Sequence, residues 1–263
     1  MNREGKASLY KPSRQNKSSI RLLATGLAIC CVLGIGCTSQ ETGLRVFAAS
    51  SMTDFIQRIA EDQATTQRGG DLDVNIAGSG TLLAQLNEGA AADVVILAGT
   101  EYMERLQEME SFLPPLQFAS TSLTVVVSPE LAGANISMED LKVGRLQGAA
   151  CVGSAPCGQL AEEFAAMTDL DLNSFTREPN VRSVLAKVER GEVDYGFVYR
   201  SDFLSTQTNI AEIKDSGAET FVTFYSLAVA RDTPNMTQVE SLLELITSSS
   251  GEEHLRQLGF EDP

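Results

Sequence analysis

The sequence predicts an α/β protein. Two observations carry this prediction: segments typical of buried strands alternate with segments of helical periodicity, and the strand expected at 93–98 (DVVILA) is almost continuously apolar. A continuous apolar strand is typical of a sheet that is covered on both faces. The chain has 263 residues, 43% hydrophobic and 21% charged, which is enough to bury the core of one large or two small domains.

The first part of the chain alternates strictly between strands and helices. Strands are expected at 44–49, 73–77 and 93–98, and helices at 53–67, 81–88 and 100–110. In the first helix, Phe55, Ile56 and Ile59 share one face, and Gly89 suits the end of the second helix. Because parallel strands need crossover connections, this order predicts a parallel sheet with helices between its strands.

A second unit follows after residue 121. Strands are expected at 122–128, 149–153, 195–199 and 220–230, and helices at 157–167, 180–190, 238–246 and 252–258. In the helix at 180–190, Val181, Val184 and Val188 lie on one face, and Gly191 ends it. The sequence therefore predicts two successive α/β units.

The first 36 residues differ from the rest of the chain. Residues 1–21 hold six basic side chains and one acidic one, and residues 22–36 carry no charge. This apolar run is shorter than the roughly 20 residues that span a bilayer, so it indicates a secretory signal peptide, residues 1–36; an uncleaved anchor is the alternative. Cleavage would change the net charge from −15 to −20, with 14 basic and 34 acidic side chains.

Five cysteines are present, and two roles are expected among them. The ending LGIGC resembles a bacterial lipoprotein signal, so we expect lipidation of Cys37 and a protein exported to the cell envelope, lipid-anchored at the outer face of the cytoplasmic membrane or periplasmic. Cys151 and Cys157 are spaced unlike the CxxC of zinc or redox sites. In an exported protein they are expected to form a disulfide, with two free thiols as the alternative.

Three turns of small and hydroxyl residues lead from expected strands into expected helices. They are ASSMT at 49–53, GSGT at 78–81 and GSAPCG at 153–158. A helix N-terminus exposes unpaired N–H groups with a partial positive charge, so converging helix starts can bind an anion without Lys or Arg. Because Ser and Thr cap most helices, each turn alone is explained as a structural cap.

Other chemistries have little support. The acidic charge argues against nucleic-acid binding, and one histidine cannot make a multi-histidine metal site. The turn at 78–81 lacks the lysine of a P-loop, and the chain has no GxSxG motif. A secreted serine hydrolase using Ser51 or Ser79 is the remaining enzyme hypothesis, but its only candidate base, His254, lies in a charged terminal helix and is expected at the surface.

Five short segments, in order, resemble the molybdate-binding proteins of ABC importers. They are VFAASSMT at 46–53, AGSGTL at 77–82, GAAADV at 89–94, FVYRSD at 197–202 and LGF at 258–260. The resemblance implies the type II periplasmic-binding-protein fold, in which two α/β lobes are joined by two crossover strands, here near 123–127 and 225–229. The ligand lies in the cleft between the lobes, which close by hinge motion.

The resemblance also implies lobe boundaries and a ligand site. One lobe would be residues 44–122 plus 226–263, and the other residues 123–225. The oxyanion contacts carried over by motif are the hydroxyl and N–H groups of Ser51 and Ser79, the backbone N–H groups of Cys157 and Val181, and the phenol of Tyr199. Asn180 replaces the Asp that precedes Val181 in the family pattern.

A site made only of neutral donors suits a fully ionised oxyanion. Each N–H bond to the anion is charge-assisted, whereas a protonated phosphate would leave a donor unpaired at a cost of about 1–3 kcal/mol. The resemblance thus implies a non-enzymatic receptor that binds molybdate or tungstate and delivers it to an ABC-transporter permease. We expect a monomer with no cofactor, and molybdenum or tungsten bound only as the oxyanion; sulfate or another small solute is the alternative ligand.

Overall fold

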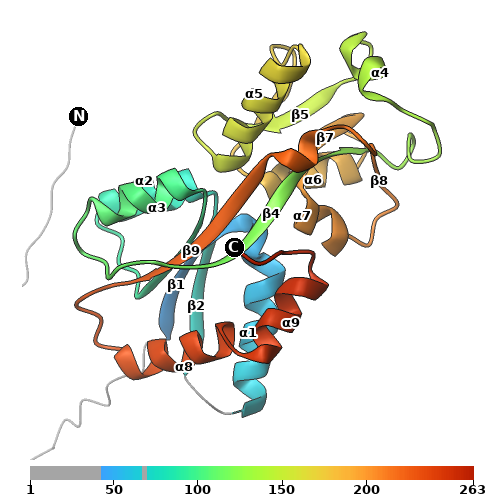
Figure 1. The fold of residues 1–263 in the computed structure, drawn as a ribbon. Helices are drawn as coiled ribbons and strands as arrows, with labels where there is room; N and C mark the ends of the chain where they lie inside the picture. Colours follow the sequence, from blue (N-terminus) through green and yellow to red (C-terminus); the bar gives the residue numbers. More distant parts are fainter. Residues whose placement is uncertain (1–42, 67–69) are drawn as a thin grey trace, which may run out of the picture. The chain divides into compact units, whose positions relative to one another are not determined.

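The computed structural model describes residues 43–66 and 70–263, which fold around one mixed β-sheet (Figure 1). The expected signal peptide and Cys37 lie outside these residues. The strand order is β2-β1-β3-β9-β4-β7-β5-β6, with β8 paired to β4. The strands are β1 (Leu44–Ala49), β2 (Leu72–Ala77), β3 (Val94–Ala98), β4 (Leu116–Val127), β5 (Gly148–Cys151), β6 (Thr176–Glu178), β7 (Tyr195–Tyr199), β8 (Ala211–Glu212) and β9 (Val222–Val229).

Helices connect most of these strands. They are η1 (Ser50–Met52), α1 (Thr53–Thr66), α2 (Ser79–Asn87), α3 (Thr100–Gln107), α4 (Met138–Lys142), α5 (Pro156–Thr168), α6 (Val181–Glu189), α7 (Arg200–Ser205), η2 (Ala218–Thr220), α8 (Met236–Ile246) and α9 (Ser249–Gln257). The short elements α4, α7, β6 and β8 were not expected, because so few residues show no clear periodicity. Within the described part of the chain, no helix has the length and apolar character needed to cross a membrane.

The direction of the strands differs between parts of the sheet. β1 is parallel to both β2 and β3, which confirms the prediction from the first strands and helices. β5 is likewise parallel to β6 and β7. In contrast, β9 runs antiparallel to β3 and β4, and β4 runs antiparallel to β7. The sheet is therefore mixed, with β4 and β9 as the antiparallel strands between two parallel groups.

β4 changes its partner along its length. Residues 116–122 pair with β9, whereas residues 123–127 pair with β7. Figure 1 shows β4 and β9 running side by side through the middle of the fold. One hydrophobic cluster draws its buried residues from 123–218, and the other two from 44–119 and 225–260. Separate cores thus form on either side of the point where β4 changes partner.

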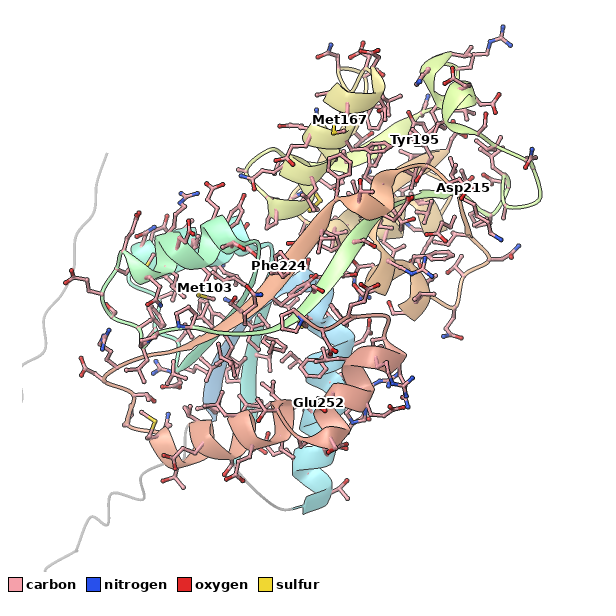
Figure 2. The ribbon with its side chains drawn as sticks, viewed as in Figure 1. Met103, Met167, Tyr195, Asp215, Phe224 and Glu252 are labelled. Atoms are coloured by element: carbon pink, nitrogen blue, oxygen red, sulfur yellow. A yellow bond between two sulfur atoms is a disulfide. The ribbon has the colours of Figure 1, made fainter. Side chains whose placement is uncertain are left out.

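Helices cover both faces of β3, which explains its continuous apolar run. Val94, Ile96 and Ala98 pack in the cluster that includes α1, α8 and α9. Val95 and Leu97 pack in the cluster that includes α2 and α3, where Met103 is labelled in Figure 2. Successive strand residues face opposite sides of a sheet, so all five positions of β3 are buried.

Asp93 ties three segments together just before β3. This carboxylate is 1% exposed and accepts hydrogen bonds from the Arg45 backbone N–H at 2.9 Å and its Nε at 3.2 Å. It also accepts from Thr233 Oγ1 at 2.8 Å and Asn235 Nδ2 at 3.3 Å. Asp93 therefore links β1, β3 and the segment before α8.

Candidate functional site

A small cavity gathers all five residues that were expected to contact an oxyanion. Ser51, Ser79, Cys157, Val181 and Tyr199 all line it. The other lining residues are Ala49, Ser50, Gly78, Ala98, Ala155, Pro156 and Asn180. No lysine, arginine, aspartate or glutamate is among these lining residues, so the polar groups that face the cavity are neutral.

Ser51 comes from η1, directly after β1. Its side chain is buried, and its Oγ accepts a hydrogen bond from the Tyr225 hydroxyl at 2.8 Å. A hydroxyl has a single hydrogen, and this arrangement leaves the hydrogen of Ser51 available to donate into the cavity. Tyr225 lies on β9, 174 residues away, and is fully buried.

Ser79 has an equivalent arrangement at the start of α2. This helix begins at Ser79 rather than at Thr81 as expected, so Ser79 is its first residue. The Ser79 Oγ accepts a hydrogen bond from the Ala98 backbone N–H at 3.0 Å. The serine hydrogen is again left to donate, and the unpaired N–H groups of the first helical turn lie beside it.

Cys157 is the second residue of α5 and joins Cys151 in a disulfide. The Cα atoms of the two cysteines are 5.7 Å apart, and both side chains are buried. Cys151 is the last residue of β5, so the bridge fastens the first turn of α5 to the end of that strand. It therefore restrains the backbone that carries the Cys157 N–H group.

Val181 is the first residue of α6, and Asn180 caps this helix. The Asn180 Oδ1 accepts a hydrogen bond from the Ser183 N–H at 3.0 Å. Asn and Asp are about equally good N-caps, so the replacement of the family's Asp keeps the helix start intact. It also removes a negative charge from the cavity wall, since Asn180 lines the cavity.

Tyr199 ends β7 and points a phenol into the buried region beside the cavity. Its side chain is 2% exposed, and its Oη interacts with the Thr223 side chain but makes no hydrogen bond of standard geometry to another described residue. Burial strongly raises the pKa of this phenol, and the nearby Asp202 raises it further. Tyr199 therefore keeps its proton at any physiological pH and can act as a donor.

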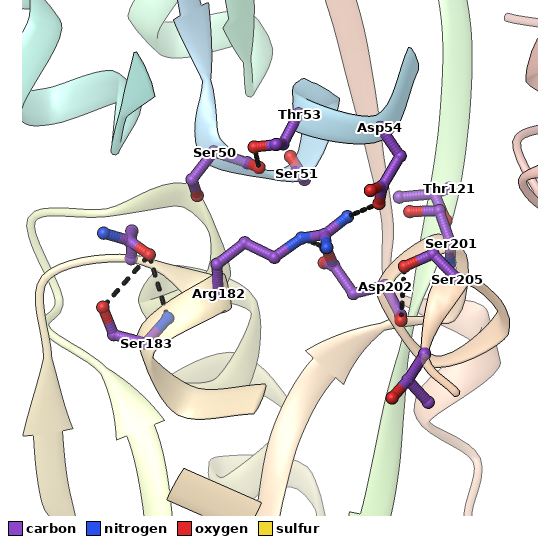
Figure 3. A network of polar contacts seen from close by, with 12 residues as sticks. Ser50, Ser51, Thr53, Asp54, Thr121, Arg182, Ser183, Ser201, Asp202 and Ser205 are labelled. Atoms are coloured by element: carbon purple, nitrogen blue, oxygen red, sulfur yellow. Dashed lines mark hydrogen bonds and ion pairs between the residues drawn. The ribbon is translucent and has the colours of Figure 1, made fainter. Parts of the chain in front are cut away.

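The charged residues closest in sequence to the cavity turns are not among its lining residues. Arg182 follows Val181 and pairs with Asp54 and Asp202, as Figure 3 shows. The positive charge of Arg182 is thus balanced by two carboxylates. The cavity consequently offers hydrogen-bond donors and helix N-termini, not a net cationic side chain.

A larger groove elsewhere is a poorer candidate for an anion. It is lined by residues of β4, α8, α9 and the C-terminal segment, including Glu252, Glu253, Glu261 and Asp262. Arg256 is the only basic side chain in its lining. This acidic groove contains none of the residues expected to bind the ligand.

The structure places His254 away from both candidate nucleophiles. His254 lies on α9, and its Nε2 is 3.0 Å from the Asp62 carboxylate of α1. It does not line the cavity that holds Ser51 and Ser79. The described residues also contain no cluster of three or more His, Cys, Asp or Glu side chains arranged to hold a metal ion.

Sequence reasoning missed two contributors to the site. Tyr225 orients Ser51, and Ser50 lines the cavity beside it. Ser50 belongs to the same small-residue turn as Ser51, so the turn itself was a signal for it. Nothing in the local sequence signals Tyr225, because its role depends on the position of β9 opposite η1.

This arrangement is the type II periplasmic-binding-protein fold. The chain belongs to the family of bacterial extracellular solute-binding proteins, whose sequence pattern matches residues 44–261. It is 30% identical over 229 residues to the molybdate-binding protein ModA of Mycobacterium tuberculosis, covering 87% of this chain and 88% of that protein.

Solved structures show the same fold. The periplasmic molybdate-binding protein of Azotobacter vinelandii superimposes with a TM-score of 0.72 at 18% identity, over 84% of this chain and 99% of that one. The sulfate-binding protein SubI of Mycobacterium tuberculosis superimposes with a TM-score of 0.68 at 15% identity, over 84% of this chain and 87% of that one. At these identities the structural likeness establishes the fold and not the ligand.

Proposed function

We propose that this protein is an extracytoplasmic receptor that binds molybdate or tungstate as the intact oxyanion and delivers it to an ABC-transporter permease. The observation that carries the proposal is the convergence of Ser51, Ser79, Cys157, Val181 and Tyr199 on one cavity without charged side chains. The same five positions were expected from motifs alone, and they span most of the chain. The 30% identity to a molybdate-binding protein supports this ligand.

The donors of this cavity suit a dianion that carries no proton. Ser51 and Ser79 already accept a hydrogen bond each, so their hydrogens are directed to the ligand. Hydrogen bonds to an ionised acceptor are roughly twice as strong as neutral ones. The site thus compensates the ligand's lost hydration without burying a lysine or arginine in contact with it.

We further propose that the site lies between two lobes, residues 44–122 plus 226–263 and residues 123–225, which close over the ligand. Glycines from the first lobe lie against backbone of the second. A Cβ on Gly78 would be 2.7 Å from the Pro179 carbonyl oxygen, and one on Gly80 would be 2.4 Å from the Ser154 carbonyl oxygen. These distances are too short for any side chain. The two proposed lobes can therefore approach this closely only because glycine occupies both positions.

The proposed location and partners follow from the N-terminal sequence and the family. A cleaved signal at residues 1–36 and a lipid on Cys37 would hold the receptor at the outer face of the membrane, near its permease. We propose that the receptor works as a monomer, does not catalyse a reaction and needs no cofactor. The disulfide between Cys151 and Cys157 is consistent with an oxidising compartment outside the cytoplasm.

Titration calorimetry of the mature chain tests the ligand directly. We expect tight one-to-one binding of molybdate and tungstate, weaker binding of sulfate, and no binding of protonated phosphate. Molybdate against sulfate is decided by the size of the cavity, because both are unprotonated tetrahedral dianions. Binding of sulfate or phosphate without binding of molybdate would contradict the proposed ligand.

Sulfate is the second candidate, since SubI, a sulfate-binding protein, has the same fold. Its likeness to this chain is confined to the fold at 15% identity, whereas the molybdate-binding relative matches over most of the sequence. Competition between the two anions in one titration ranks them without further assumptions.

Ser79→Ala is expected to weaken molybdate binding roughly 10- to 100-fold, the effect of losing one hydrogen bond of about 1.5–3 kcal/mol to a charged group. The matched control is Ser111→Ala, an exposed serine outside the cavity. Calorimetry on both variants measures the effect, and unfolding curves show whether each is folded. Equal affinity of Ser79→Ala and the wild type would remove Ser79 from the site.

A further inference from the structure

Arg182 lies between two carboxylates that come from distant parts of the chain. It is the second residue of α6, and its Nε is 2.6 Å from Oδ1 of Asp202, in α7. Its Nη2 donates to Oδ2 of Asp54, the second residue of α1. Figure 3 shows the guanidinium reaching from α6 to both partners.

The two partners of Arg182 differ in burial. Asp202 is 0% exposed, whereas the Asp54 side chain is 35% exposed and that of Arg182 is 26% exposed. Burial raises the pKa of Asp202 to about 6, and Arg182 opposes this rise. Asp202 is therefore ionised at neutral pH and needs a cation beside it, so Arg182 and Asp202 form the permanent pair. Asp54 is the outer partner, within reach of water.

The bond between Arg182 and Asp54 joins two turns of the ligand cavity. Arg182 directly follows Val181, and Asp54 comes shortly after Ser51; Val181 and Ser51 both line the cavity. Within the lobes proposed above, Asp54 belongs to one lobe and Arg182 to the other. Breaking this bond leaves Arg182 paired with Asp202. Opening the cleft therefore leaves no buried charge without a partner.

We propose that Arg182 is a positioning residue for oxyanion binding, which, anchored on Asp202, holds the closed cleft together by pairing with Asp54. This inference rests on the proposed function. This pair of Arg182 and Asp54, which we call the latch, contacts no ligand atom. It slows opening of the cleft and keeps the Val181 and Ser51 donors at the separation that the ligand requires. A partly exposed latch is also reversible, as release to a permease requires.

Asp54→Asn removes the latch and leaves the buried pair in place. We expect molybdate to dissociate about tenfold faster from this variant, the effect of one partly buried charge-assisted hydrogen bond, with little change in the association rate. Stopped-flow mixing with molybdate measures association, and displacement of bound molybdate measures dissociation, both followed by tyrosine fluorescence. The matched control is Glu101→Gln, which alters another contact across the cleft, an exposed hydrogen bond from Gln159 to Glu101 at 3.0 Å.

Arg182→Lys gives an independent check. A lysine keeps the positive charge near Asp202 but lacks the planar fork that contacts two carboxylates at once. Its dissociation rate should match that of Asp54→Asn, and the double variant should be no faster than either single one. A purely structural role would instead lower the unfolding temperature of the ligand-free protein and leave dissociation unchanged.

The outcomes separate this inference from the proposed function. Wild-type protein that fails to bind molybdate would contradict both the function and the latch built on it. Wild-type protein that binds normally, together with unchanged dissociation from Asp54→Asn, would contradict the role of Arg182 alone.

Discussion

Gly80→Ala is expected to weaken molybdate binding by about a hundredfold or more, because keeping the cleft open costs at least two charge-assisted hydrogen bonds. The added Cβ would lie 2.4 Å from the Ser154 carbonyl oxygen, a backbone atom that cannot swing aside. Ser154 belongs to the turn at 153–158 that carries Cys157, so moving it also moves a proposed donor. Calorimetry with molybdate measures the loss.

The same substitution should leave the ligand-free protein folded. Gly80 is in α2, and alanine stabilises a helix by roughly 0.5–1 kcal/mol relative to glycine. We expect an unfolding temperature equal to or slightly above that of the wild type, and a smaller further rise on adding molybdate than the wild type shows. Gly133→Ala is the matched control, since a Cβ there meets nothing within 4 Å. Full affinity in Gly80→Ala would show that binding does not need the closed arrangement.

Asp93→Ala is expected to lower the free energy of unfolding by about 3 kcal/mol, because the partly buried donors that converge on this buried carboxylate lose their acceptor. Arg45 is 38% exposed and can reach water. The loss should therefore lie at the lower end of the roughly 3–5 kcal/mol that breaking a buried ion pair costs. For a protein of this size the unfolding temperature should fall by about 6–12 °C. Thermal and denaturant unfolding measure both quantities.

A control variant and a binding measurement test whether the role of Asp93 is purely structural. Asp73→Ala, at an exposed position on β2, should change the unfolding temperature little. Molybdate affinity of folded Asp93→Ala should match the wild type, since Asp93 precedes β3 and the cavity lies at the opposite end, at Ala98. Weaker binding with unchanged stability would contradict the purely structural role of Asp93.

The effect should also depend on pH. Burial alone would raise the pKa of Asp93, but hydrogen bonds from Arg45 and Thr233 outweigh it and leave the pKa lowered. A carboxylate with a lowered pKa contributes stability above its unfolded pKa of about 3.9 and loses it as the pH falls through the folded value. The difference in unfolding free energy between wild type and Asp93→Ala should therefore be constant near neutral pH and shrink below about pH 4.

Local sequence determines much of the scaffold of this protein. The apolar run at 93–98 predicts a doubly covered strand, and β3 is buried at every position. The face shared by Val181, Val184 and Val188 predicts α6, and all three are buried there. These features depend on residues within a few positions of each other, so periodicity and capping reveal them. Asn180 marks the start of α6 for the same reason.

Motif resemblance extended the prediction from single turns to a ligand site. It named Ser51, Ser79, Cys157, Val181 and Tyr199, and the structure places all five around one cavity. Taken one at a time, the turns look like ordinary helix caps, because an isolated serine at a helix start has the same local pattern whether or not it faces a ligand. The order of several motifs along the chain is what made a shared ligand site, rather than separate helix caps, the expectation.

What the sequence alone determined is therefore the order of the longer strands and helices and the turns that carry the proposed donors. Tertiary structure decided the antiparallel direction of β4 and β9, the hydrogen bond from Tyr225 to Ser51 across 174 residues, and the placing of Arg182 between Asp54 and Asp202. Periodicity and capping are short-range and leave a trace in the sequence. Contacts between distant residues depend on how whole strands and helices pack, and no local pattern encodes that packing.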